Sequence, residues 1–199
     1  MDIAFVDFET TGLSAQKEHI IEVGIVLTHD MVITETYNTL VNPLVPIPEY
    51  ITRHTNISDR DVANAPSFPN IAEKIQELLK DKLFIAHNAQ FDYSFIQEEF
   101  QRLSMSFTEE AMCTVKLSRY LYPQYRNHTL DHLIQRHNIV CTNRHRALDD
   151  ANVMLSFMKA INAEFPESLV KAGMKKAMIT RNKTDIKKTY KRRYYRYYS

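Results

Sequence analysis

The chain has 199 residues, of which 44% are hydrophobic, and it contains two cysteines. This size suits one globular domain with an appendage, and the apolar content is sufficient for a sizeable core. Two cysteines exclude a disulfide-rich secreted scaffold and a Cys-rich zinc cage. No run approaches the ~20 apolar residues that a membrane-spanning helix needs, and the N-terminus lacks the pattern of a signal peptide. We therefore expect a cytoplasmic location and no membrane partner.

The net charge of +1 hides an uneven distribution of charged residues. Residues 171–199 carry 11 Lys and Arg and one acid, whereas the rest of the chain carries 14 basic and 23 acidic residues. From Lys187 to Ser199 the cations alternate with tyrosines, a composition that can bind phosphates and stack on unpaired bases. We place the main domain at 1–166 and a basic, aromatic-rich extension at 167–199. Nucleic-acid binding and a solvated or partner-bound terminus are both open for the end of this extension.

The first half of the chain predicts three strands, a loop and two helices. Apolar runs bounded by turn residues are typical of strands, and the second and third runs are separated by a link short enough for an antiparallel hairpin. Prolines predict the loop, and cap residues followed by apolar residues at helical spacing predict the helices. The strands are expected at Ile3–Val6, His19–Thr28 and Val32–Leu40, the loop at Asn42–Glu49, and the helices at Ser58–Ala65 and after Ser67.

The second half predicts one further strand and a series of helices. The strand is expected at Leu83–Ala86, and the helices at Asp92–Leu103, Thr114–Leu121, after Thr129, and at Ala147–Phe165. A meander of three strands, followed by helix, strand and helix, indicates an α/β fold with a mixed central sheet, combining an antiparallel meander with parallel strands and flanked by helices.

Two carboxylates follow the first apolar run. Residues i and i+2 of a strand point to the same face, so Asp7 and Glu9 are expected side by side at the end of a core strand. Two like charges held together cost energy unless a cation or a shared proton offsets them. The pair is therefore a candidate metal site that needs further ligands from the rest of the chain.

Three later residues are candidates for completing this site. Asp92 opens a helix after a core strand, and Asp150 lies near the start of the last long helix, five residues after His145. Each has a plainer interpretation when taken alone. An acid at a helix start is usually a cap, and a single histidine is more often a surface or hydrogen-bonded residue.

Together these residues form three separated motifs, which are Asp7–Gly12 (DFETTG), His87–Asp92 (HNAQFD) and His145–Ala151 (HRALDDA). Their order and separation resemble the DEDD superfamily of 3′–5′ exonucleases, in its histidine or DnaQ-like subgroup, over about residues 1–165. The related tyrosine subgroup places Tyr four residues before the last Asp, where this chain has Arg146. The resemblance implies a ribonuclease H-like fold.

The resemblance implies that Asp7, Glu9, Asp92 and Asp150 hold two divalent cations, with Asp7 shared between them, and that His145 takes the proton from an attacking water. Oxygen-rich ligand sets suit Mg²⁺ or Mn²⁺ rather than zinc. Two ions about 3.5–4 Å apart can clamp the attacking and leaving oxygens of a phosphoryl displacement. A histidine with a pKa of about 6.5 suits the role of base at neutral pH.

The neighbouring Asp149 is the other candidate for the last ligand position. On a helix its side chain would point about 100° away from that of Asp150. Asp150 is preferred because it keeps the family's spacing from His145 and precedes Ala151.

The resemblance also implies contacts with the 3′ end of a substrate. Thr10, Thr11 and Leu13 would lie next to the terminal nucleotide, with Leu13 against the last base, although ordinary packing explains Leu13 equally well. His54 occupies a position where relatives carry a His-Gly pattern, from which the following residues here depart. Asn88 would contact the nucleic-acid backbone or orient the aspartate of its motif.

These features predict a metal-dependent 3′–5′ exonuclease that acts on single-stranded or frayed 3′ ends and releases nucleoside 5′-monophosphates. DNA proofreading with a polymerase partner, stand-alone repair and RNA 3′-end trimming are the open roles. A different class of function is an inactive nucleic-acid-binding or polymerase-bridging module, which the intact ligand set disfavours. The segment Gln101–Phe107 only faintly resembles a clamp-binding peptide, so we expect no sliding-clamp partner.

Overall fold

A computed structural model describes residues 1–179, and its centre is one five-stranded sheet with the order β3-β2-β1-β4-β5. The second strand pairs antiparallel with the first and third, whereas the first, fourth and fifth run parallel. The mixed sheet confirms the predicted α/β fold class. The strands are β1 (Asp2–Thr10), β2 (Ile20–His29), β3 (Val32–Leu40), β4 (Leu83–Ala86) and β5 (Ala111–Cys113).

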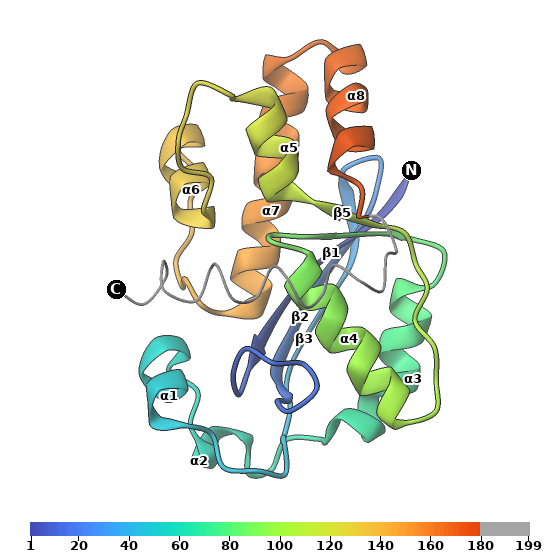
Figure 1. Ribbon diagram of the computed structural model, residues 1–199, viewed down its shortest axis with the longest axis vertical. Helices are drawn as coiled ribbons and strands as arrows, with labels where there is room; N and C mark the ends of the chain where they lie inside the picture. The colour runs from blue at the N-terminus through green and yellow to red at the C-terminus, as the bar shows by residue number, and fades with distance from the viewer. Residues whose placement is uncertain (180–199) are drawn as a thin grey trace.

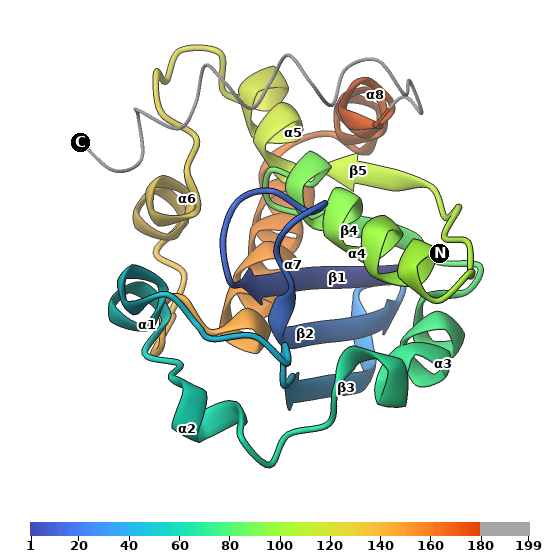
Figure 2. The ribbon, with the colours of Figure 1, turned by 60° about the horizontal axis from the view of Figure 1, so that its bottom comes forward.

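Helices cover both faces of this sheet (Figure 1). One face packs against α3 and α4, and the other against α5, α6, α7 and α8. Figure 2 shows β1, β2 and β3 side by side, with α1 and α2 beyond the end of β1. The helices are α1 (Glu49–Thr55), α2 (Asp59–Val62), α3 (Phe68–Leu79), α4 (Gln90–Arg102), α5 (Thr114–Leu121), α6 (Leu130–His137), α7 (Ala147–Glu164) and α8 (Glu167–Ala177).

Strand β1 runs through the middle of the core and sends side chains to both faces. Ala4, Val6 and Phe8 join the cluster under α3 and α4, whereas Ile3 and Phe5 join the cluster under α7. Side chains alternate along a strand, so Asp7 and Glu9 continue the face of Ile3 and Phe5. The two carboxylates therefore emerge on the side of the sheet that α7 covers.

The predicted strands before residue 90 are confirmed, and most predicted helices agree within two residues at each end. Three elements were missed. The strand β5 is only three residues long, too short for a periodic pattern. The helix α1 starts at Glu49, at the edge of the predicted proline-rich loop. The helix α8 lies in the segment that the sequence assigned to the basic extension.

Helix α8 is packed on the domain rather than separate from it. Val170 and Ala177 are buried in the core under α7, and a Cβ on Gly173 would lie 2.8 Å from the side chain of Leu117 on α5. Residues 167–177 are thus packed on the domain. The boundary between the main domain and the basic extension, expected after residue 166, stays a prediction. The tyrosine-rich end, Lys187–Ser199, lies outside the described residues. Within residues 1–179 no helix is long and apolar enough to cross a membrane.

The start of α7 crosses β2 at Gly24, where backbone meets backbone. An ideal Cβ on Gly24 would lie 2.2 Å from the carbonyl carbon of Ala147 and 2.3 Å from the nitrogen of Leu148. Any larger residue at this position would push the helix away from the sheet. The glycine is therefore required by packing, because it lets the first turn of α7 sit directly on the strand.

We expect Gly24→Ala to lower the free energy of unfolding by about 3 kcal/mol, since the new methyl group meets main-chain atoms that cannot rotate away. Gly173→Ala is the matched control. Its Cβ would meet only the side chains of Leu117 and Tyr120, and alanine gains up to about 1 kcal/mol of helix propensity. Urea unfolding of both variants measures the difference in stability. An equal loss of stability in the two would contradict a backbone clash specific to Gly24.

Candidate active site

Two carboxylates of the site stand at the end of β1. Asp7 pairs in register with Gly24 of β2, and Glu9 pairs with Glu22. Both acids are half-buried. The backbone that α7 crosses at Gly24 therefore lies beside the strand segment that carries Asp7.

Asp92 reaches the same place from the first turn of α4. The turn before this helix contains Asn88 in the left-handed conformation (φ 63°), and the carbonyl of Asn88 accepts the N–H of Phe91 (2.8 Å). Asparagine tolerates this conformation better than most residues. The Phe8 N–H donates to Asp92 Oδ1 (3.2 Å), which ties the helix to β1 between Asp7 and Glu9.

The start of α7 is held on the sheet by a carboxylate that lies outside the three sequence motifs. Glu22 is fully buried, and its two oxygens accept three hydrogen bonds from Arg146 (2.8–3.1 Å) and one from the Ala147 N–H (3.1 Å). A charged residue inside the apolar run of β2 was the available signal, because such a residue is rarely buried without a partner. These hydrogen bonds hold Arg146 and Ala147 on β2. They thereby place His145, just before this pair, and Asp150, shortly after it, over the end of β1.

Asp150 and Asp149 point in different directions from the first turn of α7. Asp149 is within 3.4–3.5 Å of Thr142 and Asn143 in the preceding loop. Asp150 is 5% exposed and accepts a hydrogen bond from Arg144, which also donates to Asp131 of α6 (2.6 Å). The geometry thus supports Asp150 as the member of the site.

Three of the predicted residues come together as a possible ligand set. Glu9, His145 and Asp150 each offer a donor atom, and these atoms all lie within 4.8 Å of one another. The other oxygen of Asp150, Oδ1, is buried without a hydrogen-bond partner among the described residues. A buried, unpaired carboxylate oxygen is costly, and a bound cation would remove that cost.

Burial raises the pKa values of the four carboxyls, and repulsion from neighbouring acids adds to it. Burial is the largest cause for each. It raises the pKa of Asp7 well above its usual range, with repulsion from Asp92 and Asp150 adding to it. The pKa of Glu9 and that of Asp92 each rise to about 8. The pKa of Asp150 is also raised, although the ion pair with Arg144 acts against burial. The cluster therefore favours bound protons or cations at neutral pH.

The residues present fit divalent cations. Asp7, Glu9, Asp92 and Asp150 supply only carboxylate oxygens, the ligands that hard cations such as Mg²⁺ prefer. Arg144 lowers the pKa values of three of them, but one guanidinium cannot neutralise four carboxylates. The negative charge that remains would attract divalent cations.

His145 sits in the loop before α7 with an unusual backbone and a ring neighbour. Its φ is 62°, and its ring centroid lies 3.9 Å from that of His54 on α1. The expected pKa near 6.5 is wrong for this structure. Burial, followed by repulsion from His54 and Arg144, lowers the pKa of His145 to about 4. The ring is therefore neutral at physiological pH and able to accept a proton.

The predicted substrate residues lie around the same strand end. Thr10 donates to the carbonyl of Gly12 (2.7 Å), and Thr11 donates to Glu18 (2.7 Å). Their hydroxyls therefore shape the turn after β1, and Leu13 is half-buried within it. Of the remaining two predicted residues, His54 is brought to His145, whereas Asn88 lies in the turn that leads to Asp92.

Solved structures of nucleases share this architecture. Exonuclease X in complex with 5′ overhanging duplex DNA is 23% identical, with a TM-score of 0.68 over 86% of this chain and 99% of its own. E. coli exonuclease I in complex with a dA16 oligonucleotide is 16% identical, with a TM-score of 0.77 over 86% of this chain and 42% of its own. At these identities the likeness concerns the fold, which is ribonuclease H-like. Fold and site together define a ribonuclease H-like domain with a carboxylate centre.

Comparison of sequences gives the family. The chain belongs to the exonuclease family, whose profile matches residues 4–158. A PolC-type DNA polymerase III of Caldanaerobacter subterraneus is 34% identical over 92% of this chain, and the 3′-5′ exonuclease DinG of Staphylococcus haemolyticus is 35% identical over 78% of it. The chain spans only 13% and 17% of the length of these two relatives.

Replacing the last ligand candidate separates the two adjacent acids. We expect Asp150→Asn to lower kcat by at least about 1,000-fold, because the site loses a carboxylate beside Glu9 and His145. Asp149→Asn changes the same kind of group one residue away and should leave kcat within about threefold. Rates of nucleotide release measure both variants, and a larger loss in Asp149→Asn would reverse the assignment.

Metal removal should change how stability depends on pH. Carboxyls whose folded pKa values are raised bind more protons folded than unfolded, so without metal their contribution to stability is fully present below about pH 4 and is lost as pH rises toward about 8. Divalent ions bind the deprotonated form, so the gain in Tm from Mg²⁺ over EDTA should grow across this range. Thermal melts at several pH values measure this gain in Tm. A gain that shrinks as pH rises would contradict the placing of the metal site at these carboxyls.

Proposed function

We propose that this chain is a metal-dependent 3′–5′ exonuclease that hydrolyses phosphodiester bonds at single-stranded or frayed 3′ ends and releases nucleoside 5′-monophosphates. The observation that carries the proposal is the convergence of four carboxylates, from β1, α4 and α7, beside a neutral histidine. Family membership and the 35% identity to a 3′-5′ exonuclease support it.

The cofactors we propose are two divalent cations, Mg²⁺ or Mn²⁺, held by Asp7, Glu9, Asp92 and Asp150. When bound, such ions neutralise charge on the scissile phosphate and lower the pKa of a bound water. Removing all metal with EDTA should therefore abolish activity, and adding back either ion should restore it.

The chain's own contribution is to hold the base and its surroundings. His145 accepts the proton of the attacking water at a ring nitrogen, which is unprotonated at neutral pH. The ring of His54 limits its movement from one side, and the Glu22–Arg146 pair fixes the backbone that follows it. At the position where the tyrosine subgroup has its tyrosine, this chain has Arg146, which pairs with Glu22 instead.

The substrate we propose is a DNA 3′ end, seated against Thr10, Thr11 and Leu13, with His54 and Asn88 nearby. The relatives named above include a DNA polymerase, which favours proofreading or repair and makes a polymerase a candidate partner. A structural neighbour that recognises the 3′ end of histone mRNA, at 18% identity and a TM-score of 0.71, keeps RNA trimming as the alternative. We further propose a cytoplasmic location and a nucleic-acid-binding role for the basic extension.

The test is release of mononucleotides from a 3′-labelled single-stranded DNA oligomer. We expect Mg²⁺- or Mn²⁺-dependent release of nucleoside 5′-monophosphates that stops in EDTA, with no release from a 5′ label until late in digestion. Asp150→Asn is the control for a contaminating nuclease. Binding of the oligomer without any metal-dependent product would favour the inactive binding module instead.

Parallel reactions on matched DNA and RNA oligomers, and on duplex DNA with a mismatched 3′ end, separate the roles. A preference for DNA with faster removal of a mismatched terminus would support proofreading. A preference for RNA would support end trimming, because the 2′-OH is the group that distinguishes the two substrates.

A further inference from the structure

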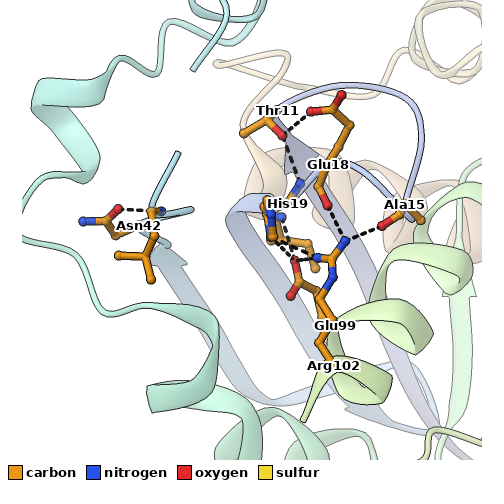
Figure 3. Close-up of polar contacts among 9 residues, drawn as sticks. Thr11, Ala15, Glu18, His19, Asn42, Glu99 and Arg102 are labelled. Carbon is orange, nitrogen blue, oxygen red and sulfur yellow. Dashed lines mark hydrogen bonds and ion pairs between the residues drawn. The ribbon is translucent and has the colours of Figure 1, made fainter. Parts of the chain in front are cut away.

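Arg102, in the last turn of α4, is hydrogen-bonded to the loop that joins β1 to β2 (Figure 3). Its Nη2 donates to the carbonyl oxygens of Ala15 (2.7 Å) and Glu18 (3.1 Å). Its Nη1 donates to Oε1 of Glu99 on the same helix (2.9 Å). One guanidinium therefore bridges a helix carboxylate and two main-chain groups of the loop.

Arg102 is held in this position by Glu99 and His19. Glu99 is 4% exposed and also accepts the N–H of Ile20 at the start of β2 (3.4 Å). The Nδ1 atom of His19 lies 2.9 Å from Nη1 of Arg102. The same nitrogen of His19 lies 3.3 Å from Oε1 of Glu99, so His19 contacts both members of the Arg102–Glu99 pair. The guanidinium is thus bonded on several sides, which favours a single side-chain position.

Through Glu18, the loop that Arg102 binds also holds the side chain of Thr11. The carboxylate of Glu18 accepts the hydroxyl of Thr11 (2.7 Å), and that hydroxyl accepts the N–H of His19 (2.9 Å). The side chain of Glu18 also lies over Gly12, where a Cβ would be 2.8 Å from its Cδ. The residue whose carbonyl Arg102 binds is therefore the residue whose side chain holds Thr11 (Figure 3).

We propose that Arg102 is a positioning residue that sets the place of the turn at Thr11–Leu13 and, through it, the binding of the 3′-terminal nucleotide. This inference rests on the proposed function, which seats the 3′ end at that turn. Helix α4 carries Asp92 at its start and Arg102 at its end, so one rigid element aligns a ligand carboxylate with the loop.

The surroundings of Arg102 make its role testable without collapse of the core. Its side chain is 27% exposed and borders a cavity of about 150 Å³ between α3, α4 and the end of β3. A smaller or uncharged side chain therefore frees the loop but meets no steric clash. Lysine keeps the charge but lacks the planar fork that serves two carbonyls and a carboxylate together.

The test compares Arg102→Met, Arg102→Lys and the control Arg60→Met, which removes the same charge from an exposed site on α2. With a single-stranded DNA oligomer we expect Arg102→Met to raise KM about tenfold with kcat within about threefold, because ground-state binding is lost and the carboxylates stay in place. Arg102→Lys should fall between this variant and the wild type, and Arg60→Met should match the wild type.

Product inhibition gives a second readout. The inhibition constant of a nucleoside 5′-monophosphate should rise in Arg102→Met by a factor similar to that of KM, since both report the terminal-nucleotide site. A KM equal to that of Arg60→Met, or a loss confined to kcat, would overturn the proposal.

Amide hydrogen exchange separates this inference from the proposed function. Exchange in residues 11–19 should be faster in Arg102→Met than in Arg60→Met, whether or not the protein cleaves DNA. Unchanged exchange would refute the restraint even in an active enzyme. A wild type that releases no mononucleotide would instead refute the proposed function, and faster exchange would then leave Arg102 as the anchor of the loop alone.

Discussion

The desolvation of several carboxylates gathered at one end of the sheet is the constraint on which the rest of this structure depends. Asp7, Glu9, Asp92 and Asp150 are brought to the end of β1 by three different elements, and burial raises the pKa of each. Such an arrangement is unfavourable unless protons or cations occupy it. Arg144 offsets only part of the charge. A fold that keeps this cluster in place therefore creates a strong preference for cations, which is the physical basis of the site.

The cluster requires that α7 start at a defined point on the sheet, and β2 provides that point. Glu22 binds the backbone and side chain of the first residues of the helix, while Gly24 removes the side chain that would hold the helix away. Both residues lie on the same face of β2, two positions apart. The strand thus acts as a support for His145 and Asp150, although it carries neither of them.

Helix α4 performs a similar role from the opposite face of the sheet. Its first turn presents Asp92, and its last turn binds the loop after β1 through Arg102. The two ends of one helix therefore connect the carboxylate cluster to the turn that follows Glu9. Because a helix is stiff over this length, the distance between these two regions is set by the backbone rather than by flexible side chains.

Much of the fold follows from local sequence, because β1 to β4 are apolar runs bounded by turn residues and the helices repeat their apolar residues. The short β5, the helix α1 after the prolines and the helix α8 in a basic segment were missed, since tertiary contacts rather than local pattern stabilise them. The sequence alone determined that Asp7 and Glu9 share a face and that Asp92, His145 and Asp150 share motifs with known nucleases. Only the tertiary structure decided that Glu22 and Arg146 support the site, that Arg102 holds the loop, and that the pKa of His145 falls. These effects arise from contacts and burial between segments up to 125 residues apart. No local pattern in the sequence encodes such contacts.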